Sequence, residues 1–267
     1  MPPIDDRAFA VDAVAVAAVG ALVCAASQNL LLMTALVPVV VVARCAVWWR
    51  LPLASRGHGP GVEATLFGVC LALGAFNDWN SVVHHRIYEY TVPCYLPAVT
   101  TIPLWMLLYW GLIVRAFVSL CRWGRLAPPA APRDEVAGCR SPRPWLKVGI
   151  ELVLVLGTRQ AIYRWSTDPI WSWLPFAIAL VAWLSLLRPR RHDLKLLAIV
   201  ALVGPAVESL YIQVGQLHRY SLGWLGGVPL WIALWWMLAI VIVSDLSLRA
   251  LGWLSQASRD TAVAAQR

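Results

Sequence analysis

The amino-acid sequence predicts an all-α membrane protein, a polytopic bundle of about eight helical spans arranged as two parallel four-helix repeats. Of its 267 residues, 60% are hydrophobic and 13% are charged, and the mean hydropathy is +0.67. Soluble domains are about 45–50% apolar and about 25% charged. The apolar residues fall in runs long enough to cross a bilayer, and the basic residues gather in alternate loops. This pattern excludes a soluble enzyme and a soluble nucleic-acid-binding protein, in spite of the net charge of +8.

The expected spans follow from length and hydropathy. A helix that crosses a bilayer needs about 20 mostly apolar residues. The stretches that meet this requirement are 8–27, 29–48, 64–83, 98–121, 146–163, 170–187, 194–214 and 228–250. We expect the first to be a retained span and not a signal peptide, because Asp5 and Asp6 precede it and no convincing small-residue cleavage site follows it.

The distribution of Lys and Arg predicts the orientation of the chain. Cytoplasmic loops of membrane proteins retain positive charge. With the N-terminus inside, about 16 of the 22 basic residues fall in inner segments and about four fall in outer loops. We therefore expect a multi-pass protein of the cell membrane with both termini in the cytoplasm. Its surroundings are membrane lipid, and no nucleic-acid partner is expected.

A proline- and arginine-rich segment divides the chain. Residues 122–147 contain three prolines within five positions, so we expect a cytoplasmic linker between four-span halves at 1–121 and 148–267. The last span of each half opens with Pro-Leu-Trp, at Pro103-Leu104-Trp105 and at Pro229-Leu230-Trp231. Halves with an even number of spans would be parallel repeats, with a shared site between them toward the outer face. The alternative is that Pro-Leu-Trp is only a common way to begin a membrane helix.

Glu208 is the main candidate for chemistry, because a charged side chain inside a bilayer is costly and is functional by default. It lies about two turns from the outer end of the seventh expected span. Gly204, Tyr211 and Gly215 share its helix face, and the glycines leave room for a partner helix or a ligand. An apolar environment favours the protonated form of a carboxylic acid, so Glu208 is a candidate general acid. The alternative is a structural hydrogen bond between helices.

A second polar stripe lies at the end of the third expected span. Asp78, Val82, His85 and Glu89 would share one face if the helix continued past the membrane edge. Acid, imidazole and acid on one stripe suit proton transfer. His85 and Glu89 also have the i, i+4 spacing of two metal ligands, to which His218 could add a third. A solvated polar cap is the remaining alternative.

The other charges are expected to be structural. Asp245 and Arg249 have the i, i+4 spacing of an ion pair at the inner end of the last span. We expect Arg115 to extend inward to the lipid headgroups and Glu63 and Asp168 to lie at the membrane interface.

The cysteines predict neither a disulfide framework nor a zinc site. The six of them show no CxxC spacing, and only Cys94 is expected in an outer loop. Apart from the alternative at His85, Glu89 and His218, we expect no metal and no cofactor at the site.

The segment Glu208–Leu238 contains several residues that match a pattern found in a known protein family. They are Glu208, Gly215, Tyr220, Gly227-Val228-Pro229-Leu230 and Trp236. In these positions the chain resembles the carotenoid-biosynthesis membrane protein family, which includes bacterioruberin-type carotenoid hydratases. It departs from that family at Gln216-Leu217-His218-Arg219, where a turn containing Phe or Tyr and Gly is usual. The resemblance implies an all-helical membrane enzyme that acts on a long polyene or isoprenoid without a redox cofactor, with Glu208 as its acid.

The leading hypothesis is an integral membrane enzyme that protonates a C=C bond of a long isoprenoid or carotenoid-type lipid near the outer leaflet, leading to hydration or cyclisation. Asp78 or His85 would position or deprotonate water. The candidate catalytic residues are Glu208, Asp78, His85 and His218. Most candidate substrate-binding residues are aromatic, because aromatic faces stabilise cationic character. They are Trp79, Tyr88, Glu89, Trp105, Tyr211, Tyr220, Trp224 and Trp231.

Two other classes of function are compatible with the sequence. A membrane transporter or permease would suit parallel repeats and an intramembrane acid. A structural subunit of a larger membrane complex would need neither. A lipid substrate that co-purifies with the protein would favour the enzyme.

Overall fold

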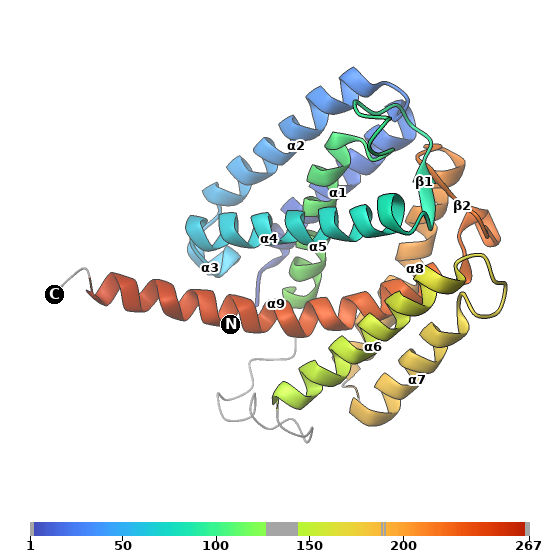
Figure 1. Ribbon diagram of the computed structural model, residues 1–267. Helices are drawn as coiled ribbons and strands as arrows, with labels where there is room; N and C mark the ends of the chain where they lie inside the picture. Colours follow the sequence, from blue (N-terminus) through green and yellow to red (C-terminus); the bar gives the residue numbers. More distant parts are fainter. Residues whose placement is uncertain (1–2, 127–143, 188, 190, 265–267) are drawn as a thin grey trace.

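The chain forms a bundle of long helices, which we describe from a computed structural model of residues 3–126, 144–187, 189 and 191–264 (Figure 1). Most of the expected linker at 122–147 lies outside these residues. At its two ends, residue 122 is the last residue of one helix, and residues 144–147 belong to the start of another.

The first half contains α1 (Asp6–Ala26), α2 (Leu30–Arg50), the short α3 (Leu53–Arg56), α4 (Pro60–Asp78) and α5 (Leu104–Arg122). Their first turns follow the ordinary capping rules. Asp5 and Asn29 precede α1 and α2, and their side-chain oxygens accept hydrogen bonds from the backbone N–H groups of Ala8 and Leu32. α4 begins with Pro60, whose missing N–H is not needed in a first turn.

The second half contains α6 (Pro144–Trp165), α7 (Leu174–Leu187), α8 (Arg191–Gln213) and α9 (Leu230–Ala264). The 3₁₀ turn Leu225–Gly227 leads into α9. Gly226 lies there in the left-handed region, with φ 64°, and a Cβ at this position would lie 1.9 Å from the Ser209 hydroxyl oxygen. This turn therefore requires glycine both for its backbone and for its space.

Six helices of the described chain are long and apolar enough to cross a membrane. They are α1, α2, the stretch Leu53–His84 that contains α4, α5, α8 and the part of α9 up to Leu254. α7 is apolar but has only 14 residues, fewer than the about 20 of a typical span. The prediction of a helical protein with several helices able to span a membrane is confirmed.

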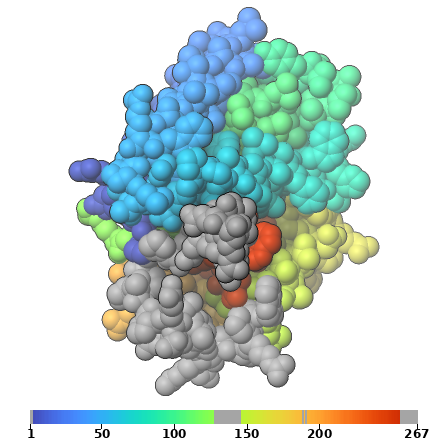
Figure 2. All heavy atoms as spheres, turned by 90° about the vertical axis from the view of Figure 1, so that its left-hand side faces the viewer, coloured from blue at the N-terminus to red at the C-terminus, as the bar shows by residue number. Residues whose placement is uncertain are grey.

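The helices pack as two groups that meet along α5 and α9. α1, α2 and α4 each contact α5, α6, α7 and α8 each contact α9, and α5 contacts α9. Figure 2 shows the first group above and the second below. At the junction the rings of Trp110 and Trp236 stack with centroids 6.1 Å apart. Each ring lies over a glycine, because a Cβ at Gly74 would come within 2.4 Å of Trp110 and one at Gly204 within 3.0 Å of Trp236.

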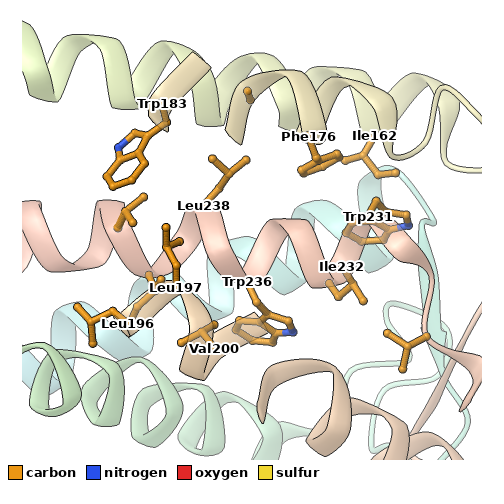
Figure 3. Close-up of a cluster of buried hydrophobic side chains, with 14 of the residues drawn as sticks. Ile162, Phe176, Trp183, Leu196, Leu197, Val200, Trp231, Ile232, Trp236 and Leu238 are labelled. Atoms are coloured by element: carbon orange, nitrogen blue, oxygen red, sulfur yellow. The ribbon is translucent and has the colours of Figure 1, made fainter. Parts of the chain in front are cut away.

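The second group encloses a core of aromatic and aliphatic side chains (Figure 3). Trp231 of α9 lies toward Ile162 and Phe176, and its ring centroid is 5.9 Å from that of Phe176. Trp236, from the next turns of α9, lies toward Val200 of α8. α9 thus uses large side chains on two of its faces, one toward α6 and α7 and one toward α8.

A short strand pair ties the two helix groups together at one end of the bundle (Figure 1). β1 (Tyr88–Tyr90) follows α4 and pairs antiparallel with β2 (His218–Tyr220), which follows α8. The register sets Tyr88 opposite Tyr220, Glu89 opposite Arg219 and Tyr90 opposite His218. Because neighbouring side chains of a strand alternate in direction, Glu89 and Arg219 point away from the aromatic side chains on either side of them.

A network of buried charges holds the first group together. Arg115 of α5 is fully buried and donates to Glu63 of α4 at 2.9 Å. Arg44 of α2 donates to Asp12 of α1 at 2.6 Å, and the guanidinium of Arg44 also pairs with Glu63. The expectation that Arg115 extends to the headgroups is therefore wrong, and the interfacial position of Glu63 stays a prediction. Each side chain is held inside the bundle by an opposite charge on a neighbouring helix.

The second group has its own ion pairs. Asp245 lies 3.4 Å from Arg249, as expected from the i, i+4 spacing, and 2.9 Å from Lys147 of α6. Lys147 also lies 3.7 Å from Glu151. These pairs join the start of α6 to α9.

Candidate active site

A cavity of about 170 Å³ lies between the two helix groups. Its wall is built by α1, α4, α5, α6, α8 and α9 together with both strands. Along α8 it extends from Ile199 to Tyr211, about 18 Å at 1.5 Å per residue. Apolar side chains line its inner part, and most of its polar side chains gather near β1 and β2. The cavity is therefore narrow and elongated, with a polar end.

Glu208 of α8 lies in the wall at this polar end. Its oxygen Oε1 accepts from the Tyr220 hydroxyl and lies 3.2 Å from Nε2 of His218. In the described part of the chain, no hydrogen-bond partner contacts the other oxygen, Oε2. Glu208 is thus anchored through one oxygen, and the other is available to a molecule in the cavity.

Asp78, the last residue of α4, is the second carboxylate of the site. It is completely buried. Its oxygen Oδ1 accepts from the hydroxyl of Tyr88, and Oδ2 accepts from the hydroxyl of Tyr90 at 2.6 Å. The tyrosines line the cavity, and Asp78 lies behind them. Asp78 therefore reaches the cavity through their hydroxyl groups.

Burial keeps the three tyrosines of the strand pair in the neutral form that donates a hydrogen bond. Desolvation, and next the nearby carboxylate of Asp78, raise the pKa of Tyr88 and of Tyr90 well above its usual value. Desolvation and the carboxylate of Glu208 do the same to the pKa of Tyr220. Each phenol thus remains a hydroxyl donor to its carboxylate.

The partners of the two carboxylates follow the same sequence spacing in each half of the chain. Asp78 binds the side chain ten residues later, Tyr88, and Glu208 binds the one ten residues later, His218. Each also binds a tyrosine twelve residues later, as in the pair of Glu208 and Tyr220. The two residues with positive φ other than glycine, among those the structure describes, are Arg86 and Gln216, each two positions before its strand.

Arg159 of α6 brings a positive charge to the cavity wall. It donates to the Ser81 hydroxyl at 2.7 Å, and its guanidinium carbon lies 4.9 Å from the ring centroids of both Tyr163 and Trp235. A guanidinium this close to two aromatic rings is attracted by both through cation–π contacts. Arg159 therefore offers a fixed positive charge to the polar end of the site.

Several predicted site residues come together here. Glu208, His218, Tyr88, Tyr211, Tyr220 and Trp231 line the cavity, and Asp78 lies directly behind two of its tyrosines. The Tyr211 hydroxyl forms a hydrogen bond with that of Tyr109, also in the wall. Residues from the third and seventh expected spans thus meet at one place, although 130 positions separate Asp78 from Glu208.

The expected stripe of Asp78, His85 and Glu89 is wrong. After Asp78 the chain continues as one π-helical turn, Trp79–His84, and then bends at Arg86 into β1. His85 therefore stacks on Tyr163, with ring centroids 3.7 Å apart, and is absent from the cavity wall. Glu89 faces outward and forms an exposed pair with Arg219. A strand reverses the side-chain direction at each residue, so the helical spacing no longer applies.

Three of the expected aromatic residues also lie elsewhere. Trp79 is 47% exposed and Trp224 is 72% exposed, and neither lines this cavity. Trp105 is buried in the core of the first group. Sequence reasoning missed Tyr90 and Trp236, which do line it. The repeated separations of ten and twelve residues after an acid were the signal that could have found Tyr90.

The alternative of a metal site is not supported by the geometry. In the described chain, no group of three or more His, Cys, Asp or Glu side chains could hold a metal ion. The three residues considered as ligands have separate partners, because His85 stacks on Tyr163, Glu89 pairs with Arg219, and His218 lies beside Glu208.

Comparison with known proteins adds no relative to this description. No family model, no curated protein and no solved structure matches the chain. The resemblance of Glu208–Leu238 to the carotenoid-biosynthesis membrane protein family stays a prediction, and the function is argued from the cavity.

Proposed function

We propose that this protein is an integral membrane enzyme that protonates a C=C bond of a long isoprenoid or carotenoid-type lipid near the outer leaflet, with Glu208 as the acid. The observation that carries the proposal is the oxygen Oε2 of Glu208, which has no hydrogen-bond partner among the described residues and lies at the polar end of an otherwise apolar cavity. An alkene offers no hydrogen-bonding group, so its protonation needs a carboxylic acid within contact distance and little competing water. This role agrees with the one that the family resemblance implies for Glu208.

The dimensions of the cavity favour the end group of a long lipid as the bound part. A cavity of about 150 Å³ holds a benzene molecule, and this one has about 170 Å³. Val203 of α8 belongs to the wall and is also 54% exposed, so the cavity reaches the surface beside α8. A lipid can insert one end from the bilayer at this point while the rest of its chain remains between the helices and the acyl chains.

The aromatic wall suits the cation that protonation creates. Trp231, Trp236 and Tyr220 line the cavity, and the edge of Tyr220 meets Trp231 with centroids 5.7 Å apart. Aromatic faces attract cations by about 2 kcal/mol or more when water is excluded. The carboxylate of Asp78, behind Tyr88, adds a negative charge close to the same place.

Lipid analysis and turnover test this function together. Mass spectrometry of lipids that co-purify with the full-length protein should find an isoprenoid, and membranes containing the protein should convert an added acyclic polyene, lycopene, to a new product. A variant with Val200→Trp, which fills the inner part of the cavity, should lose both the bound lipid and the conversion. An unchanged polyene with folded wild-type protein would contradict the proposal.

We further propose that the chain has eight spans in two parallel four-helix repeats, with both termini in the cytoplasm. Equal separations between each carboxylate and its partners support the duplication. So do the matching contacts of α1, α2 and α4 with α5 and of α6, α7 and α8 with α9. The basic residues of the inner segments support the orientation.

Labelling of single cysteines tests the orientation. In a cysteine-free background, Leu96→Cys in the outer loop should react with a membrane-impermeant maleimide on intact cells, whereas Pro52→Cys should react only after the membrane is opened. Both residues are exposed and lie outside the stretches able to cross the membrane, so labelling depends on the side of the membrane. The reverse pattern would contradict the proposed topology.

A further inference from the structure

The two carboxylates of the site differ in how many of their oxygens are occupied. Both oxygens of Asp78 accept a tyrosine hydroxyl, whereas Glu208 uses only Oε1. Hydrogen bonds donated to both oxygens of a carboxyl group favour its ionised form. Glu208 can therefore carry a proton on Oε2 toward the cavity, while Asp78 is suited to receive one.

We propose, on the basis of the proposed function, that Asp78 receives, through Tyr88, the proton that the reaction releases. The reaction is then an isomerisation, by cyclisation or by a shift of the double bond, and not a hydration. Glu208 touches the substrate and is catalytic. Tyr88 also lines the cavity, whereas Asp78 acts through Tyr88 and is a positioning residue.

The steps balance without water or another reactant. The proton on Oε2 of Glu208 forms a C–H bond at one alkene carbon and leaves a cation at the other. In a cyclisation, a second double bond of the same lipid attacks that cation and forms a C–C bond, which leaves a new cation. In a shift of the double bond, the first cation remains. A neighbouring C–H bond then breaks, and its electrons form the new C=C bond. Its proton passes to the Tyr88 oxygen while the Tyr88 hydroxyl proton passes to Asp78.

The strand pair brings the two half-sites close enough for the proton to return. Tyr88 and Tyr220 lie opposite each other in the register, with ring centroids 5.4 Å apart, and each hydroxyl binds one of the carboxylates. The His218 ring lies 5.7 Å from that of Tyr88. A proton that returns from Asp78 to Glu208, and so restores the starting state of the enzyme, therefore has to cross only this pair of strands.

Hydration would need a water molecule held beside the cation by polar groups of the wall. The inner part of the wall is apolar, and neither residue first considered for positioning water faces the cavity. Asp78 is 0% exposed, is absent from the cavity wall, and has both oxygens engaged. His85, the other residue considered for this role, stacks on Tyr163 outside the wall.

Isotope labelling of the product tests the inference. The purified full-length protein in lipid nanodiscs is given lycopene as the probe, once in deuterium oxide and once in ¹⁸O-labelled water. We expect a product isomeric with lycopene that gains one deuterium for each converted end group and no ¹⁸O. A product that is heavier by one water and carries ¹⁸O would overturn the inference and leave the proposed function intact. Unconverted lycopene would overturn both.

Tyr88→Phe separates this proton path from simple packing. The variant keeps the ring and removes the hydroxyl, so it should lower kcat about 100-fold with little change in KM. Asp78→Asn should act in the same direction, and Asp78→Glu should restore part of the activity. The matched control is Tyr95→Phe, whose hydroxyl binds Thr34 at 3.2 Å away from the cavity and whose loss should leave turnover unchanged. Wild-type turnover in folded Tyr88→Phe would overturn the inference.

Discussion

Glu208→Gln should reduce product formation by about 10²–10⁴-fold while the protein still folds and inserts. The substitution keeps the size and shape of the side chain and removes only the transferable proton. The amide oxygen can still accept from His218 and Tyr220, as Oε1 of Glu208 does. The measurement is product formed per folded protein, with folding judged by a monodisperse elution profile in detergent.

Glu89→Gln is the matched control for this variant. It makes the same chemical change on the outward-facing side of β1, where Glu89 pairs with Arg219 and is 49% exposed. Exposed ion pairs contribute little, so activity should fall by less than about fivefold. If Glu208→Gln retained as much activity as this control, Glu208 would not be the acid.

Arg115→Met should destabilise the protein by about 3–5 kcal/mol, because it removes one of the two arginines that neutralise the buried carboxylates of Asp12 and Glu63. Arg115 is fully buried and binds Glu63 through Nε, at 2.9 and 3.2 Å from the two carboxylate oxygens. It also lies 3.1 Å from Asp12. Methionine fills similar space but has no charge. The thermal midpoint in detergent should fall by about 10 °C.

Two further variants show whether charge is the reason. Arg115→Met combined with Glu63→Gln removes one charge of each sign, so it should lose clearly less stability than the sum of the two single variants. Arg125→Met breaks a pair with Asp6 in which both side chains are more than half exposed, and it should leave the midpoint nearly unchanged. A double variant as unstable as that sum would mean that packing, and not charge, dominates.

Hydropathy was sufficient to predict the helices but not their interruptions. Every expected span overlaps a helix, since a continuous apolar run has few other ways to satisfy its backbone in a membrane. The expected stripe of polar residues requires the helix of the third span, at 64–83, to continue as far as Glu89. The π-helical turn Trp79–His84 and the positive φ of Arg86 end it instead. Those features depend on the pairing of β1 with β2, which no local pattern reports.

The role of Arg115 could not be predicted from its own span because its partners lie on other helices. The position of Arg115 in its span says nothing of Glu63 and Asp12, its neighbours across the bundle. Asp12 received no role, although it pairs with Arg44. An ion pair between α-helices is a property of packing, so it becomes visible only when the helices are assembled.

The candidate site was predicted in its chemistry but not in its membership. Glu208, His218 and Tyr220 could be found from the sequence because they are polar or aromatic residues in and beside one span. Trp79 and Trp224 have the right side chains but lie on exposed turns. Tyr90 is in the site only because alternate residues of β1 face the same way as Tyr88.

The pairing of β1 with β2 makes loop length a property on which the site depends. One residue inserted between Glu208 and His218 would shift β2 by one position and exchange its inward and outward faces. Arg219 would then turn toward the carboxylates, and His218 and Tyr220 would turn away. One residue inserted between Asp78 and Tyr88 would likewise shift β1 by one position and turn Glu89 toward the carboxylates. The two loops can therefore tolerate substitutions at Glu89 and Arg219 far more readily than a change of a single residue in length.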